Sequence, residues 1–169
     1  LVGSEMCIRD SPKILSAERP SPKHSEITFR QESSCCICEL INWLEFVFKC
    51  CVGENGFTRN KIEGDKKTPR GIFELENVYF RKDRKRKPQT ILKTIRIRKN
   101  MGWCDDINSK KYYNKLIKIS HNLRHEKLFR HDYKYNFFLP VKYNWKNIKL
   151  NKGSAIFIHL TKNYQPTAG

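Results

Sequence analysis

Apolar and polar residues alternate along most of the chain from about Leu44 onward, and this period of two predicts β-strands. In ILKTIRIRK, for example, Ile95 and Ile97 fall on one side and Arg96 on the other. Aromatic and β-branched residues are frequent in the same segments, which favours extended structure. We expect strands within residues 46–52, 72–80, 91–99, 133–144 and 153–160.

The segments between these runs are polar and contain glycine or proline, which is typical of loops. Residues 62–71 and 81–90 are predicted to be loops, and His121 to Tyr133 is the only plausible short helical turn. Strands at this spacing, separated by turn signals, predict a mainly all-β fold, a sandwich or barrel with a short helical segment. We find no internal repeat.

The two ends of the sequence differ in character from its middle. Residues 1–11 (LVGSEMCIRDS) resemble adapter DNA read as protein, and we expect them to be an artefact rather than a genuine leader. Residues 12–43 are polar with Pro and Ser and predict a divergent or disordered leader. The remaining 126 residues, 44–169, suffice for one domain, which we expect to be incomplete at its C-terminus.

Charge narrows the choice of partners. The 169-residue chain carries 34 Lys+Arg against 17 Asp+Glu, a formal charge of +17, which implies anionic partners such as nucleic acid, an acidic membrane face or a wall polymer. Residues 81–99 hold ten Lys or Arg and one acid, Asp83, so they form either an anion-binding strip or a solvated face, the interpretation we prefer. No apolar stretch approaches the ~20 residues of a membrane-spanning helix, so no integral membrane segment is expected.

The cysteines give a weak metal signal. Cys35 and Cys38 have the CxxC spacing of zinc ligands, and the adjacent pair Cys50 and Cys51 could complete a site. Neighbouring residues of a strand point to opposite faces, however, which makes a shared tetrahedral site awkward. We therefore expect no metal and interpret these residues as small buried apolar groups. The seven cysteines are Cys7, Cys35, Cys36, Cys38, Cys50, Cys51 and Cys104.

The C-terminal segment GSAIFIHLTKNYQPTAG carries the strongest chemical signal. Its strand ends at His159, and a Pro-Thr-small-Gly turn follows. This stretch resembles the catalytic core of the L,D-transpeptidases (YkuD-type domain), in which a strand His precedes a Ser/Thr-His-Gly-Cys loop. Thr167, Ala168 and Gly169 occupy the positions before the family's nucleophilic Cys, which would be the next residue.

Three further segments match the branch of this family in which a small or acidic residue replaces the loop His, and the resemblance runs from about Phe46 to Gly169. The first is GDKKTPRGIF, the second WCDDINSKKYYN and the third HEKLFR. The matching residues are Gly64, Asp65, Thr68, Pro69, Gly71 and Phe73; Trp103, Asp105, Asp106, Tyr113 and Asn114; and His125, Glu126 and Arg130.

The resemblance implies cysteine acyl transfer on peptidoglycan stem peptides, with no metal or organic cofactor. His159 would be the general base, because Ala168 replaces the loop His, and the Gly169 backbone would help to hold the oxyanion. Cys104 is rejected as nucleophile, because two neighbouring Asp carboxylates disfavour a thiolate. The candidate substrate-binding residues are Trp103, Asp105, Asp106, Tyr113, Asn114, His125, Glu126, Arg130 and Thr167.

Several alternatives stay open at this point. His159 could be a satisfied core histidine and Trp103 a core residue or groove wall. Asp105 and Asp106 could be loop caps, and His125 and Glu126 a supporting pair or a helix-start contact. The whole protein could be a basic nucleic-acid-binding protein, although no nucleic acid is expected as partner, or a non-catalytic wall-binding homologue. By family analogy we expect a bacterial envelope or periplasmic location, and we expect the 169-residue chain to be inactive without its Cys. The oligomeric state is left open.

Overall fold

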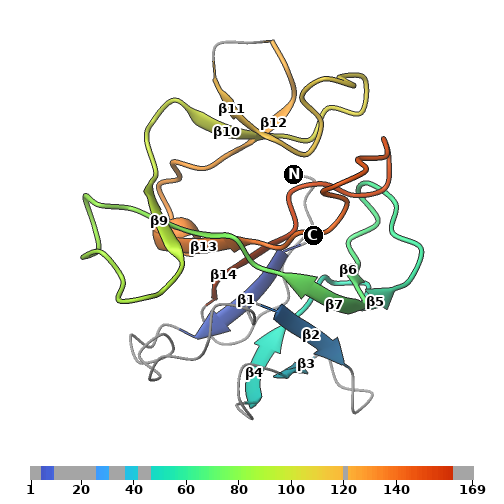
Figure 1. Cartoon of the computed structure of the whole chain (residues 1–169), viewed down its shortest axis with the longest axis horizontal. Coiled ribbons are helices and arrows are strands. Elements are labelled where there is room, and N and C mark those ends of the chain that lie inside the picture. Colours follow the sequence, from blue (N-terminus) through green and yellow to red (C-terminus); the bar gives the residue numbers. More distant parts are fainter. Residues whose placement is uncertain (1–4, 10–25, 31–36, 42–46, 120–121, 162–169) are drawn as a thin grey trace.

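The computed structural model describes residues 5–9, 26–30, 37–41, 47–119 and 122–161, and the described part is nearly all β (Figure 1). The one helical element among these residues is a 3-10 turn, η2, at Lys134–Asn136. The strands are β1 (Glu5–Arg9), β2 (Glu26–Arg30), β3 (Ile37–Ile41), β4 (Val47–Cys51), β5 (Phe57–Thr58), β6 (Thr68–Pro69), β7 (Gly71–Glu74), β8 (Asn77–Phe80), β9 (Lys93–Arg96), β10 (Met101–Cys104), β11 (Leu116–Lys118), β12 (His125–Lys127), β13 (Phe137–Pro140) and β14 (Phe157–Thr161).

The largest sheet has nine strands in the order β7-β2-β3-β4-β1-β14-β13-β8-β9. β14 lies in its interior, antiparallel to β13 on one side and parallel to β1 on the other. The backbone of β14 is thus hydrogen-bonded along both edges, as expected for an uninterrupted run of apolar residues. The sheet brings Phe138, Tyr79 and His159 into register across β13, β8 and β14.

The alternation along the C-terminal strand segment builds two cores, one on each face. Ile156 and Ile158 pack with Cys50, Val52 and Val141 in an aliphatic cluster. Ala155 and Phe157, which point to the other face, join an aromatic cluster with Trp103, Tyr135 and Phe138. The predicted division of this segment into two faces, with His159 on the side of Ala155 and Phe157, is therefore confirmed.

A second, three-stranded sheet in the order β11-β10-β12 lies at the opposite end of the molecule from β2, β3 and β4 (Figure 1). Its middle strand contains Gly102, and a Cβ atom there would lie 2.7 Å from Cδ2 of His125 on β12. Such a distance is too short for a real Cβ, so the His125 ring can lie over this position only because residue 102 has no side chain. The sequence pattern did not predict this sheet.

The loop expected at residues 62–71 contains β6 and the first residue of β7, and the strand expected to end at His159 continues to Thr161. Two further predictions are also wrong. The expected strand at 72–80 is two strands, because the chain changes neighbours: β7 pairs with β2, whereas β8 pairs with β13 and β9. The expected helical turn from His121 to Tyr133 is absent from its described residues, because His125–Lys127 is extended and pairs with β10. In both cases long-range strand pairing overrides the local pattern.

The N-terminal predictions are not decided by the fold. β1 lies within residues 1–11 and pairs with β4 and β14, and β2 and β3 lie within residues 12–43. Strand pairing does not establish the origin of these residues, so the artefact and the leader stay predictions. In the described part of the chain, Cys50, Cys51 and Cys104 are buried thiols outside any disulfide, and no cluster of metal-binding side chains forms.

Candidate active site

His159 lies on β14, and its side chain is 2% exposed. Its Nδ1 lies 2.8 Å from the carbonyl oxygen of Leu160. A carbonyl oxygen can only accept, so in the neutral ring Nδ1 carries the proton and Nε2 holds the basic lone pair. The backbone of its own strand thus fixes both the tautomer and the orientation of the imidazole.

A polar network lies beside this imidazole. The ring of Tyr135 meets that of His159 edge-on, with 5.5 Å between centroids, and its hydroxyl donates to Oε1 of Glu126 over 3.2 Å. Arg130 donates to the same carboxylate oxygen over 2.8 Å and forms a bidentate pair with Asp132. We call Tyr135, Glu126, Arg130 and Asp132 the Tyr135 network.

The charges in this network hold one another in place. The hydrogen bonds that Arg130 donates to Asp132, helped by the charge of Glu126, raise the pKa of the Arg130 guanidinium above its ordinary value. Burial alone would raise the pKa of Asp132, but the hydrogen bonds and charge of Arg130, together with Lys134, outweigh burial and lower that pKa. Two-point Arg–carboxylate pairing also fixes geometry, so the network gives Tyr135 a defined position against His159.

A second network surrounds the residues that lead into β14, and its centre is Asn114. Its Oδ1 accepts from Trp103 Nε1 at 3.0 Å and from the backbone N–H of Ala155 at 3.1 Å. Its Nδ2 donates to the carbonyl oxygens of Tyr143 and Asn144 at 3.1 and 2.9 Å. Asn114 is buried and has φ of 55°, a left-handed conformation that Asn tolerates better than most residues. All four bonds of this amide are made within the chain.

Glu63 extends the second network. Its Oε2 accepts from the hydroxyls of Tyr113 and Ser154, the latter at 2.8 Å. Burial raises the pKa of Glu63, although the two hydroxyls and Lys61 act in the opposite direction. We call Asn114, Trp103, Tyr113, Glu63 and Ser154 the Asn114 network.

The two aspartates at 105 and 106 have different surroundings. Asp105 is buried and forms an ion pair with Arg124 at 3.3 Å, and burial raises its pKa despite that pair. Its Oδ1, like Nε2 of the neighbouring His125, is buried without a hydrogen-bond partner in the described structure. Asp106 accepts from the backbone N–H of Asn108, so it caps the loop as the alternative interpretation proposed.

The structure thus divides the predicted site residues between two places. Glu126 and Arg130 lie on the side of His159, the middle residue of β14, which they reach through Tyr135. Trp103, Tyr113 and Asn114 belong instead to the network at Ser154 and Ala155, just before β14. His125 and Glu126 are neighbours on β12 and point to opposite faces, so they do not act as a pair and do not start a helix. Thr167 and Gly169 lie outside the described residues.

Sequence reasoning missed four participants: Tyr135, Asp132, Glu63 and Ser154. Tyr135 and Ser154 fall within the expected strands 133–144 and 153–160, where no chemical role was assigned to them. The only local signal was the short spacing of Arg130, Asp132 and Tyr135 after Glu126. Contacts between residues 91 positions apart, such as Ser154 to Glu63, leave no local pattern. Burial raises the pKa of Cys104, which agrees with its rejection as nucleophile.

Comparison with known proteins gives one match. The family model of the L,D-transpeptidase catalytic domain (YkuD) matches residues 41–169. No curated protein and no solved structure matches the chain. The matched residues make up more than half of the chain and include both networks and His159. The protein therefore belongs to the L,D-transpeptidase (YkuD) family, whose activity is directed at the cell wall.

Proposed function

We propose that this protein catalyses peptidoglycan cross-linking by cysteine acyl transfer, with the thiol supplied by a Cys directly after Gly169. The thiolate attacks the carbonyl carbon between the diamino acid and D-Ala of a tetrapeptide stem. The C–N bond breaks, D-Ala leaves as a protonated amine, and a thioester remains. The side-chain amine of a second stem then attacks the thioester, forms the new amide and releases the thiol.

The observation that carries this proposal is the hydrogen bond from Nδ1 of His159 to the carbonyl oxygen of Leu160. It leaves Nε2 as the basic atom of a neutral ring, the form a general base must have. The Tyr135 network limits the movement of that ring. A core histidine would need the same hydrogen bond, because a buried N–H requires an acceptor, so the expected Cys and the acylation test below distinguish the two roles.

We assign the remaining roles by position. Backbone N–H groups around Gly169 would hold the oxyanion. Asp105 is the best candidate for an ammonium group of the substrate, because its Oδ1 is buried and unpartnered among the described atoms. Trp103, Tyr113 and Asn114 form the supporting scaffold. No metal or organic cofactor takes part in this scheme.

The proposed location is the bacterial cell envelope, where the substrate of the family is found. The family is associated with the cell wall. In the described segments we find no helix that is both long enough and apolar enough to cross a membrane.

The test is acylation of the chain extended by a Cys after Gly169. A carbapenem, which opens on an activated thiol, should add its full mass to the extended protein, as seen by intact-protein mass spectrometry. The same extension ending in Ser and the 169-residue chain are the matched controls and should stay unmodified. An extended chain that gains no mass, while its thermal unfolding is unchanged, would contradict the proposal and favour a non-catalytic wall-binding homologue.

A further inference from the structure

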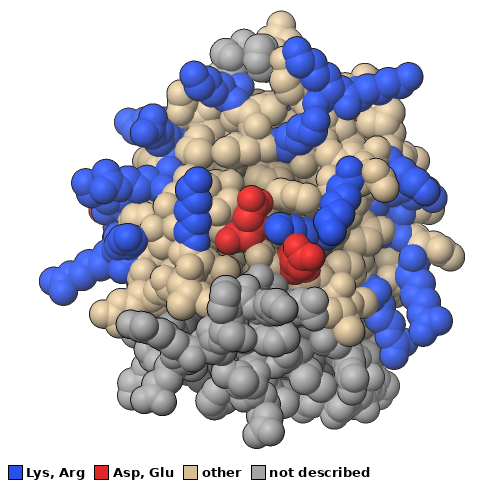
Figure 2. Space-filling view, in the orientation of Figure 1, with Lys and Arg blue, Asp and Glu red and all other residues tan. Residues whose placement is uncertain are grey.

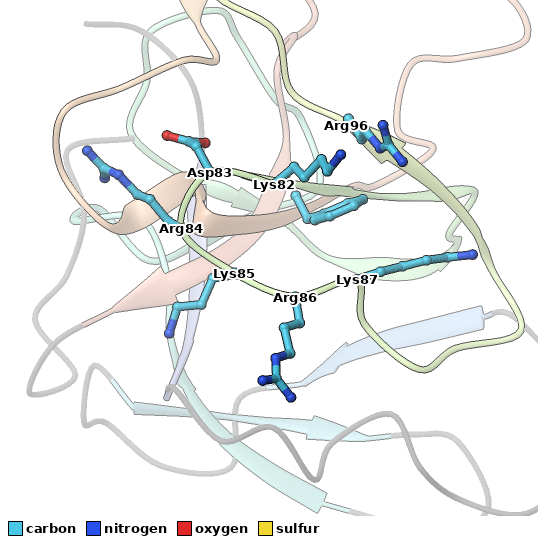
Figure 3. Close-up of a pocket in the computed structure, with 8 residues that line it drawn as sticks. Lys82, Asp83, Arg84, Lys85, Arg86, Lys87 and Arg96 are labelled. Carbon is cyan, nitrogen blue, oxygen red and sulfur yellow. The ribbon is translucent and has the colours of Figure 1, made fainter.

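A basic hollow lies at the end of β8, and its loop contacts the backbone of the segment that carries Arg130 and Asp132. An open hollow of about 490 Å³ is lined by residues of the loop after β8 and by one residue of β9. Figure 3 shows this loop and its side chains. Its lining residues are Phe80, Lys82, Asp83, Arg84, Lys85, Arg86, Lys87 and Arg96.

The loop that forms the hollow is held in a fixed shape. Arg81 is buried, its guanidinium lies 3.5 Å from the centre of the Phe129 ring, and it donates to the carbonyl oxygen of Arg130. Arg84 donates to the carbonyl oxygens of His131 and Asp132 at 2.8 and 2.7 Å. A binding loop that is ordered before its ligand arrives loses less conformational entropy on binding.

The only acid in the lining is already neutralised. Asp83 accepts two hydrogen bonds from Arg81 at 2.7 and 2.8 Å, and this pairing lowers its pKa to about 2. Lys82, Lys87 and Arg96, by contrast, pair with none of the acidic side chains in the described part of the chain. The hollow therefore carries uncompensated positive charge.

Three of the lining cations extend to one side, whereas Arg84, Lys85 and Arg86 point away from them (Figure 3). Figure 3 shows Lys82 and Arg96 extending toward the same side of the hollow, with Lys87 reaching the same way along its other rim. Figure 2 shows Lys and Arg side chains around most of the visible face of the described part.

The chemistry of the hollow fits phosphate groups better than nucleic-acid bases. Lys and Arg bind phosphate oxygens through charge-assisted hydrogen bonds. Single-stranded nucleic acids also need exposed rings on which successive bases stack. Among the described aromatic side chains the one exposed ring is Tyr133, at 39%, and the Phe80 side chain lining the hollow is only 3% exposed.

We propose that this hollow binds an anionic wall polymer whose charges are phosphodiesters, such as a polyol-phosphate chain. The choice of a wall polymer rests on the proposed function, whereas the anion site itself rests on the hollow alone. In the strand order β14-β13-β8-β9, β8 is two strands from β14, about 10 Å at the usual spacing of strands. A polymer held at Lys82, Lys87 and Arg96 would therefore keep the enzyme beside the wall on which it acts.

The test is binding of fluorescent poly(glycerol phosphate) to the 169-residue chain, followed by anisotropy at several salt concentrations. The double variant Lys82→Gln/Arg96→Gln should weaken binding about tenfold and reduce the slope of log K against log salt by about 1 to 2. The matched control Lys110→Gln/Lys118→Gln removes the same charge from exposed sites and should change binding less than twofold. All four positions are exposed, so folding, checked by thermal unfolding, should be retained.

Two results would overturn the proposal. If both double variants weakened polymer binding equally, the affinity would depend only on the net charge of the protein and not on the hollow. Tighter binding of a single-stranded DNA of equal charge at the same salt would assign the hollow to nucleic acid instead. The binding assay needs no acylation, so its outcome is independent of the carbapenem experiment. If the extended chain is acylated but the polymer does not bind, the polymer site is wrong and the proposed acyl transfer still stands.

Discussion

Two polar networks, one beside His159 in the middle of β14 and one at the residues just before that strand, differ in what they leave available for chemistry. We call the Asn114 network closed, because its hydrogen-bonding groups are paired with one another. The side-chain amide of Asn114 makes all four of its possible hydrogen bonds, and Glu63 accepts hydrogen bonds from two hydroxyl groups. The Tyr135 network instead leads to an imidazole, the side chain that ordinarily exchanges protons nearest neutral pH.

This difference separates a structural role, for the Asn114 network, from the proposed catalytic role of His159. The closed network fixes where β14 begins, including Ala155, whose φ of 51° is unfavourable for a residue with a Cβ. The Tyr135 network instead helps to fix the orientation of the His159 imidazole, which can accept a proton. We therefore expect substitutions in the Asn114 network to change stability, and those at His159 and in the Tyr135 network to change activity.

The largest expected effect is on acylation. In the Cys-extended chain, His159→Gln should slow carbapenem acylation by about 10³-fold, because it removes the proposed general base. Timed mass spectrometry gives the rate. Unfolding in urea should show only a modest loss of stability. If the variant acylates at the rate of the parent, the two networks do not differ in the way we propose.

The next effect is on stability. Asn114→Ala should cost about 3 kcal/mol, because Trp103 Nε1 and the N–H of Ala155 lose their acceptor and two carbonyl oxygens lose their donor. Asn114→Gly also removes the amide but adopts the left-handed backbone without strain, so its difference from Asn114→Ala measures the backbone cost alone. Asn108→Ala, at an exposed position, is the control. Urea unfolding measures all three. A loss below about 1 kcal/mol in Asn114→Ala would argue against a closed network.

A smaller effect should distinguish two tyrosines that each donate to a glutamate. Tyr113→Phe should cost about 1 to 2 kcal/mol of stability, because Glu63 loses a partner, and should leave the acylation rate of the extended chain within twofold. Tyr135→Phe should cost about 1 kcal/mol or less and slow acylation three- to tenfold, because His159 is held less firmly. If Tyr113→Phe slowed acylation more than Tyr135→Phe did, the Asn114 network and not the Tyr135 network would be the one that supports catalysis.

The smallest effect is the pH dependence of the closed network. Burial raises the pKa of Glu63 above its ordinary 4.5, so the folded state retains a proton that the unfolded state has already lost. The contribution of Glu63 is therefore fully present below pH 4.5 and is lost as the pH rises through its folded pKa. From pH 4.5 to 7 the parent should lose stability relative to Glu63→Gln, which keeps an acceptor for Tyr113 and Ser154.

Urea unfolding of the parent and of Glu63→Gln at several pH values measures this difference. The other shifted groups, such as Asp105 and Asp132, are common to both proteins and cancel to first order. A difference that grows in the opposite direction would mean that Glu63 is stabilised as the anion.

Sequence reasoning predicted the strand class and the division of the C-terminal segment into two faces, because alternation in FIHL is a local property. It also selected His159, Glu126 and Arg130 through the family resemblance. It missed the sheet of β10, β11 and β12, whose strands are only three or four residues long. Such short strands form only when a partner strand is present.

The sequence by itself determined the β-rich class, the family and the identity of the proposed base, since each depends on residues close together or in a fixed order. Only the tertiary structure decided which groups surround each candidate. It brought Glu63 to Tyr113 and Ser154, and Tyr135 to His159. The physical reason is that burial and hydrogen bonding act between strands that are distant along the chain, whereas a sequence pattern records only neighbours.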